Sequence, residues 1–377
     1  MTKTRSIFEE VGAEAPPPPA PVPARRPPSA RRAISVWLMV LFALVAVMIA
    51  VGGVTRLTDS GLSITEWRPV TGALPPMDDA TWTAEFDKYR ATPQAGILNP
   101  HMTLAEFKSI YWWEWGHRQL GRLIGVVWAL GFVWFLARRR IPVGWTPRLL
   151  GLGVLGGAQG AIGWWMVASG LTGEMTSVAS YRLAIHLGLA FAILGLIAWY
   201  VLSLRREEAD LLRARRQRNE GLMAWGTALI VVAFAQVVLG ALVAGIDAGR
   251  AYPEWPLMAG QLVPPGAFDL RPAWRNFLDN PGLAQFNHRM VGYLLLLLII
   301  IAFWRARASA LASLRAAFAA VLHMGLLQVA LGIATVLYAA PWQVALPHQI
   351  GAVALFTLIV RARFTALYPP AQRIARG

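Results

Sequence analysis

The chain has 377 residues, of which 56% are hydrophobic, and its mean hydropathy is +0.48. These values are too apolar for an ordinary soluble protein and are typical of one that crosses a membrane several times. The net charge of +15 does not indicate nucleic-acid binding, because Lys and Arg lie in short segments between apolar runs and signal membrane topology there. The absence of Cys excludes disulfides, thiolate metal sites, iron–sulfur clusters and c-type haem attachment.

Residues 1–32 form a tail rich in Pro and Arg. Such a segment cannot bury a core, so we predict that it is disordered. The apolar run behind it is long enough to span a bilayer, and no small-residue cleavage site follows. The tail is therefore not predicted to be a cleavable signal peptide.

Eight apolar segments follow, each near the length of about 20 residues that a bilayer requires. The sixth and eighth are short, so we expect the residues just before them to extend those helices. The sequence therefore predicts an all-α membrane protein. Its predicted spanning helices are 33–53, 116–137, 148–169, 183–204, 222–245, 288–304, 317–338 and 346–361.

The basic residues predict the orientation in the membrane. With the N-terminus inside, the inner segments hold 23 Lys and Arg against 7 Asp and Glu, whereas the outer segments hold 12 against 13. Positive charge marks the inner side of a membrane. Both termini are therefore predicted to be cytoplasmic, and the long loops 54–112 and 246–284 to lie outside, which in a bacterium is the periplasm.

Matching motifs indicate that the chain is internally duplicated. The first and fifth helices are followed by Asp59-x-Gly61 with Glu66-Trp67 and by Asp247-x-Gly249 with Glu254-Trp255. The second and sixth helices share His-Arg-x-x-Gly. Because the first and fifth helices both run outward, the duplication is parallel. It predicts two four-helix bundles, at 33–204 and 221–362, with a charged cytoplasmic linker at 205–220 and a cytoplasmic tail at 363–377.

Four histidines stand at the outer ends of apolar segments, two in each half: His117, His186, His288 and His348. Neutral imidazole is a good axial ligand for haem iron, so the pairs 117/186 and 288/348 predict two haem sites near the outer surface. One intramembrane His is more often a helix-to-helix hydrogen-bonding residue. Four at similar depth, repeated across a duplication, favour ligation.

His101 and His323 do not fit this pattern. His101 lies in an outer loop, and His323 near the inner end of its helix has no repeat partner. We therefore predict no functional role for either histidine. Arg118, Arg182 and Arg289 flank the ligand positions and are candidate contacts for haem propionates, although interfacial snorkelling explains any one of them comparably well.

Glu114 is the asymmetric residue, because the second half has Gln285 at the equivalent position. Glu114 precedes His117 by one turn and shares its helix face. A carboxylate in one half and an amide in the other suggest that only the N-terminal site performs acid–base or charge-stabilising chemistry. The alternative is a boundary carboxylate, either in water or paired with a nearby Arg.

Three helices share Gln-x-x-x-Gly, which we interpret as a packing device rather than a chemical site. Its copies begin at Gln159, Gln236 and Gln328. The outer-loop pairs Asp59/Asp247 and Glu66/Glu254 could bind a cation or propionates. We favour a structural role for them, with Gly and Pro setting the turns.

From about residue 33 to 362 the chain resembles the haem A synthase family. The resemblance rests on Glu114-x-x-His117, on the stretch Gly52–Ser63 and on Asn287-His288-Arg289. It implies oxidation of the C8 methyl of haem O to a formyl group, giving haem A for terminal oxidases. It further implies that His288 and His348 hold a permanent haem b, and that His117 and His186 bind the substrate haem O beside an essential Glu114. Some members carry a Cys pair in the first outer loop, which this chain lacks.

Two other functions also suit a pair of bis-histidine sites. One is a di-haem membrane cytochrome that only transfers electrons, which would leave the Glu114/Gln285 difference unexplained. The other is a haem carrier or assembly chaperone. The resemblance places the chain in a bacterial inner membrane. Expected partners are the lipid bilayer, haem O synthase, cytochrome oxidase assembly factors and a second copy of the chain as a homo-oligomer.

Overall fold

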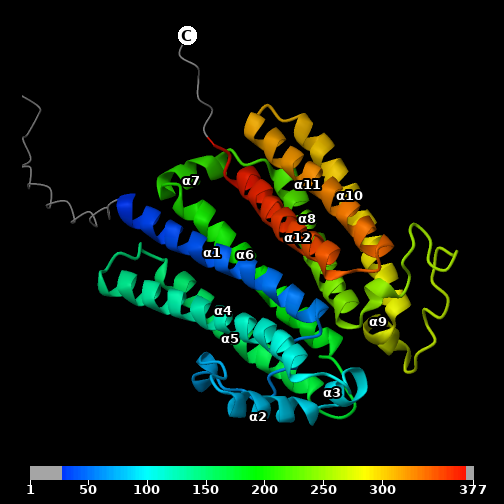
Figure 1. Ribbon diagram of the computed structural model, residues 1–377. Helices are drawn as coiled ribbons and strands as arrows, with labels where there is room; N and C mark the ends of the chain where they lie inside the picture. The colour runs from blue at the N-terminus through cyan, green and yellow to red at the C-terminus, as the bar shows by residue number, and fades with distance from the viewer. Residues whose placement is uncertain (1–27, 371–377) are drawn as a thin grey trace, which may run out of the picture.

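The computed structural model describes residues 28–370 (Figure 1). In this range eight helices are long and apolar enough to cross a membrane, and the chain is a multi-pass membrane protein. Each coincides with one predicted span, and α10 and α12 begin before their predicted starts, as expected. The eight are α1 (Pro28–Leu57), α4 (Leu104–Ala137), α5 (Thr146–Gly170), α6 (Ser180–Leu204), α8 (Glu220–Gly245), α10 (Pro281–Arg307), α11 (Ala312–Leu337) and α12 (Trp342–Leu367).

Shorter helices occupy the connections. They are α2 (Asp79–Arg90), α3 (Pro93–Leu98), α7 (Glu208–Arg216) and α9 (Asn276–Asp279), with 3₁₀ turns η1 (Thr71–Ala73), η2 (Ala248–Arg250) and η3 (Ala273–Arg275). Within residues 28–370 the β-structure is limited to one isolated bridge, between Met258 and Gln261. The predicted linker 205–220 thus contains a helix, α7.

Several predicted boundaries move because capping residues, rather than hydropathy, decide where a helix begins. Thr103 and Glu106 form a capping box, so α4 starts 12 residues before its predicted start at 116. The predicted N-terminal tail loses residues 28–32 to α1, and α12 runs to Leu367, past 362. Residues 1–27 and 371–377, which belong to the two predicted tails, lie outside the described residues.

The spanning helices form two rings of four. In the first half each of α1, α4, α5 and α6 packs on the next, and α6 closes the ring on α1. In the second half α8, α10, α11 and α12 do the same. The two rings meet where α6 and α1 pack on α8 and α12, so α4 and α5 lie on one flank of the molecule and α10 and α11 on the other (Figure 1).

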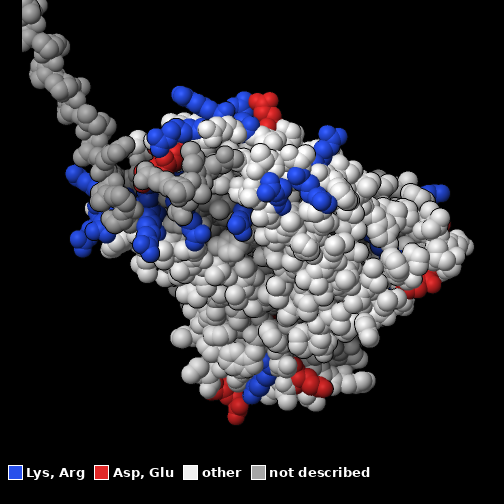
Figure 2. All heavy atoms as spheres, turned by 90° about the horizontal axis from the view of Figure 1, so that it is seen from above, with Lys and Arg blue, Asp and Glu red and all other residues white. Residues whose placement is uncertain are grey.

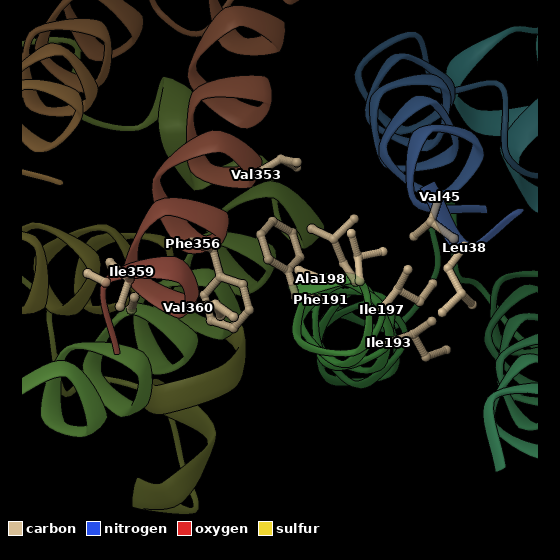
Figure 3. Packing of buried hydrophobic residues seen from close by; sticks show 14 of the residues in the cluster. Leu38, Val45, Phe191, Ile193, Ile197, Ala198, Val353, Phe356, Ile359 and Val360 are labelled. Carbon is tan, nitrogen blue, oxygen red and sulfur yellow. The ribbon is translucent and has the colours of Figure 1, made fainter. Parts of the chain in front are cut away.

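Apolar side chains fill the space where the rings meet. Figure 3 shows Phe191 of α6 beside Phe356 of α12, and their ring centroids are 5.6 Å apart. On the opposite side of α6, Leu38 of α1 packs near Ile197. In a bilayer such contacts stabilise the association of helices through close van der Waals packing. The hydrophobic effect contributes little there, because lipid tails are as apolar as the side chains.

The two ends of the bundle differ. Helices α2, α3 and α9 lie at one end, whereas α7 and the start of α1 lie at the other (Figure 1). Figure 2 shows Lys and Arg gathered over one part of the surface, and a broad uncharged area separates them from a smaller mixed group of charges. This pattern is what a positive-inside protein would present, with the predicted outer loops at the end that holds α2, α3 and α9.

Candidate haem-binding sites

The four histidines lie on helices that face each other across the two rings. His117 is on α4 and His186 is on α6, the diagonal pair of the first ring. His288 on α10 and His348 on α12 form the diagonal pair of the second. The imidazole centroids of His288 and His348 are 6.4 Å apart, and their planes are inclined by 80°.

This spacing fits two axial ligands of one metal. An imidazole nitrogen binds a first-row metal at about 2 Å, so two rings on opposite sides of it have centroids about 6 Å apart. Among residues 28–370, no group of three or more His, Cys, Asp or Glu could hold a bare metal ion. Haem supplies its own equatorial nitrogens and needs only axial ligands from the protein, so a pair of histidines is the expected donor set.

Each histidine ring lies against a glycine of a neighbouring helix. A Cβ added at Gly52 would come within 2.8 Å of Cε1 of His117, and one at Gly163 within 2.9 Å of that of His186. The corresponding distance is 3.0 Å both for Gly240 with His288 and for Gly332 with His348. Any larger residue at these glycines would displace the ring, so the glycines define the position of each imidazole.

Three of the four histidines are also contacted by a glutamine. Nε2 of Gln159 donates to the carbonyl oxygen of His186 over 3.0 Å and lies 3.2 Å from ring nitrogen Nδ1. Gln328 makes the same contacts with His348, at 2.8 and 3.2 Å. Gln236 donates to the carbonyl of His288 over 2.9 Å and lies 3.3 Å from its Nε2. The hydrogen bond to the carbonyl oxygen holds the backbone of each of these histidines, and the amide beside the ring restricts the ring's orientation.

The Glu114 carboxylate is buried and accepts four hydrogen bonds. One oxygen accepts from the Ser63 hydroxyl and from the backbone N–H of Ile64, both over 2.8 Å. The other accepts from Nε and Nη2 of Arg118, over 3.1 and 2.6 Å. With a side chain only 3% exposed, Glu114 holds a negative charge one turn from His117 and connects α4 to the outer loop. A paired carboxylate was one of the two roles that the sequence left open.

Gln285 occupies the matching place on α10 but makes weaker contacts. Its Nε2 donates to the carbonyl of Tyr252 over 3.2 Å, and its Oε1 is buried without a hydrogen-bond partner among residues 28–370. Tyr252 and Ile64 lie equally far beyond the matching aspartates Asp247 and Asp59. The same loop position thus offers its N–H to a carboxylate in one half and its carbonyl to an amide in the other.

The three arginines predicted near propionates all donate to backbone carbonyls. Arg118 donates to Ile64 and Glu66, over 2.8 and 3.0 Å. Arg289 donates to the matching positions Tyr252 and Glu254, over 3.1 and 2.9 Å. Arg182 donates to the carbonyl of Trp165 and lies 4.2 Å from the centroid of its ring. These guanidinium groups fasten the outer loops and helix ends around the histidines.

A small cavity of about 90 Å³ lies between α4 and the first outer loop. Arg68, Arg118 and Arg122 line it together with Glu66 and Glu85, so charges of both signs surround it close to the Glu114–Arg118 pair. Lys88 of α2 lies beyond it, and the hydrogen bond that Lys88 donates to Glu85 raises the pKa of Lys88. The cavity can hold water at the outer side of the site.

A model of the family described as cytochrome oxidase assembly protein matches residues 35–360. The chain belongs to this family. Three similar relatives are each named "Heme A synthase". The relative from Paracoccus denitrificans is 63% identical over 97% of each chain, and that from Dinoroseobacter shibae is 62% identical over 98% of each. The relative from Ruegeria pomeroyi is 61% identical over 99% of this chain and 100% of its own.

In this member of the family, the outer-loop acids make structural contacts. Arg56 of α1 bridges Asp59 and Asp247, over 2.8 Å each, and so links the outer ends of the two halves. Glu66 pairs with Arg68 and Lys88, and Glu254 accepts from the N–H of Gly260. These contacts agree with the structural role that the sequence favoured.

The sequence did not indicate that the Gln-x-x-x-Gly motifs border the candidate haem sites of this family member. Both residues of each motif contact a histidine, and the amide adds a polar contact to the packing that we predicted. The available signal was the spacing, which places the two residues on one helix face. Reading the motif together with the neighbouring histidine helices would have predicted the contact.

Proposed function

We propose that the chain is a haem A synthase, which oxidises the C8 methyl of haem O to a formyl group in a bacterial inner membrane. The observation that carries the proposal is the pair of histidines on diagonal helices of each ring, with a buried carboxylate one turn from His117 where the other half has Gln285. Membership of a cytochrome oxidase assembly family and the names of the three relatives support it.

The two sites have different roles in this proposal. His288 and His348 hold a permanent haem b, and His117 and His186 hold haem O as the substrate. The 6.4 Å spacing of the His288 and His348 rings supports two axial ligands on one iron. A haem b held this way has no open position for oxygen, and when bound it supplies electron transfer.

Glu114 acts on the substrate through its charge. Converting the methyl group and one water molecule into a formyl group releases four electrons and four protons, and in this proposal the electrons would leave one at a time through the haem b to an external acceptor. The Glu114 carboxylate would stabilise positive charge that develops on the substrate, or would direct the water towards the carbon. Ser63, Ile64 and Arg118 hold it in place before the reaction, so little reorganisation is needed. Glu114 thus serves as the catalytic residue, and Arg118 positions it. Arg118, Arg182 and Arg289 remain proposed contacts for haem propionates.

The test is the haem composition of cells and of the purified protein. Cells that make haem O but no haem A should produce haem A when they express the chain, and should not when they express His117→Ala. The purified chain should carry haem b together with haem O or haem A. Two equivalents of haem b and no haem A would instead indicate a cytochrome that relays electrons. Haem that is lost easily and leaves unmodified would indicate a carrier.

The proposed topology has both termini in the cytoplasm and the loops 54–112 and 246–284 in the periplasm. The excess of inner Lys and Arg supports it. A periplasmic reporter fused at residue 260 should be active, and one fused at residue 210 should be silent. An active reporter at 210 would contradict this orientation.

The proposed partners follow from the reaction. Haem O synthase would supply the substrate, cytochrome oxidase assembly factors would receive the product, and a second copy of the chain would form a homo-oligomer. Co-purification of each partner with the tagged chain from solubilised membranes tests these proposals. An unrelated membrane protein that carries the same tag is the control.

A further inference from the structure

We propose that Met48 makes His117 the loosely held histidine of the four, so that the N-terminal site exchanges its haem while the C-terminal site retains its own. The inference rests on the proposed function, in which one haem is a substrate and the other a permanent cofactor. It begins from the residue that stands four positions before the glycine at each imidazole, which is Gln for three of the histidines and Met for His117.

Each imidazole lies against a glycine, and the residue four positions earlier on the same helix completes the contact. That earlier residue is Gln159, Gln236 or Gln328 for three of the histidines. On α1, Met48 stands four residues before Gly52, the glycine that His117 contacts. The Gln-x-x-x-Gly pattern therefore has a fourth copy, in which Met replaces Gln.

Met48 occupies the same place in its ring as Gln236 does in the other. Gly121 and Gly292 each follow their histidine by four residues. A Cβ at Gly292 would lie 3.1 Å from Nε2 of Gln236, and a Cβ at Gly121 would lie 3.3 Å from Cε of Met48. The two side chains have similar length and reach, so the halves differ in chemistry here rather than in available space.

The chemical difference is the loss of an amide. A glutamine amide both donates and accepts hydrogen bonds, whereas a thioether has no donor and is a weak acceptor. Nδ1 of His117 is buried and has no hydrogen-bond partner within residues 28–370. Nδ1 of His288 also lacks a partner there, but Gln236 contacts the other ring nitrogen and the carbonyl of His288.

Removing an outer partner of a metal-binding histidine typically weakens metal affinity about 10–100-fold. A substrate site benefits from this weakness, because product must leave after each turnover. A cofactor site does not, and both of its histidines carry their glutamine. Met48 is thus a positioning residue. It shortens the time for which the site of His117 retains its haem.

The experiment measures haem loss rather than activity. The purified full chain, which carries haem b, is loaded with haem O, and transfer of haem to excess apomyoglobin is followed by absorbance. The wild type should lose haem in a fast and a slow phase, and His117→Ala, which removes the N-terminal ligand, should lack the fast one. Met48→Gln should slow the fast phase about tenfold or more, and Gln236→Met should accelerate the slow phase by a similar factor.

Met48→Leu is the matched control, because it keeps the volume without adding an amide, and it should leave both phases unchanged. Damage to the fold accelerates haem loss, so slower loss in Met48→Gln cannot come from a structural defect. A fast phase unchanged in Met48→Gln, or a slow phase unchanged in Gln236→Met, overturns the inference and leaves the proposed function standing. Failure of the C-terminal site to hold haem b, or of the N-terminal site to take up haem O, overturns both.

Discussion

The N-terminal and C-terminal candidate sites share their geometry and differ in a few side chains. Both place histidines on opposite helices of a four-helix ring and set each imidazole against a glycine. They differ at two pairs of equivalent positions: Glu114 corresponds to Gln285, and Met48 corresponds to Gln236. In our account the common frame holds haem, and these two substitutions make one site reactive and exchangeable and the other permanent.

The largest effect should come from the cofactor site. His348→Ala removes one axial ligand on α12, and the proposed haem b should be lost together with haem A production. The low-spin absorbance spectrum of the purified variant measures the first, and haem extraction from cells measures the second. His323→Ala is the control, because His323 lies elsewhere in the second half and was given no functional role.

A His348→Ala protein that keeps the full low-spin haem b spectrum would contradict the assignment of His348 as a ligand of haem b. The spectrum of His323→Ala should be that of the wild type, which separates ligand loss from general damage to α11 and α12.

Glu114→Gln should lower haem A production by about 10²–10³-fold, the typical cost of losing one well-placed electrostatic group. The variant should still bind both haems, since all four histidines remain and Gln already occupies position 285. Haem O or a partly oxidised haem should accumulate. Chromatography of haems extracted from cells expressing the variant provides the measurement.

The Glu114→Gln variant also leaves Arg118 without its carboxylate, because the amide cannot accept all four hydrogen bonds. Thermal unfolding measured beside Glu174→Gln, which changes an exposed carboxylate in the segment between α5 and α6, shows how much of the loss is structural. Wild-type haem A levels would remove Glu114 from the mechanism and leave it the role of securing the outer loop.

The glycine contacts predict a site-selective effect of intermediate size. Gly52→Ala brings a methyl group within 2.8 Å of His117, and Gly240→Ala brings one within 3.0 Å of His288. Overpacking of this kind costs about 1–3 kcal/mol, so the haem of the affected half should be released faster and that of the other half should not. Transfer to apomyoglobin separates the two phases.

Gly156→Ala provides the control for the glycine pair, since a Cβ at Gly156 would meet nothing within 4 Å. Equal acceleration of both phases by Gly52→Ala would indicate that the halves unfold together, and would contradict independent sites.

Hydropathy and charge predicted all eight spanning helices, because a bilayer admits few other ways to satisfy a backbone. The histidines and Glu114 could be chosen from their spacing for the same reason, since polar residues are rare in such segments. The start of α4 was missed, because Thr103 and Glu106 set it beyond the apolar run. Met48 was also missed, since a methionine in an apolar helix carries no signal until its neighbours are known.

The smallest effect concerns the link between the two halves. Arg56 is 12% exposed and joins Asp59 to Asp247, which are 41% and 44% exposed. Arg56→Ala should destabilise the protein by only about 1 kcal/mol, because solvent screens both carboxylates. The midpoint of thermal unfolding should fall slightly, and both haems should be affected alike.

Arg213→Ala is the matched control for Arg56→Ala, because it removes an exposed ion pair, that with Asp210, within one helix. A large loss of haem from one half alone after Arg56→Ala would show that Arg56 belongs to that site rather than to the contact between the halves.

The most direct test of the account is the identity of the haem that each site retains. His117→Ala should leave a protein that contains haem b alone, and His288→Ala should leave one from which only haem O is extracted. Mass spectrometry of haems from the two purified variants, made in the same cells, gives both answers. Haem b as the sole pigment of both variants would contradict the division into a substrate site and a cofactor site.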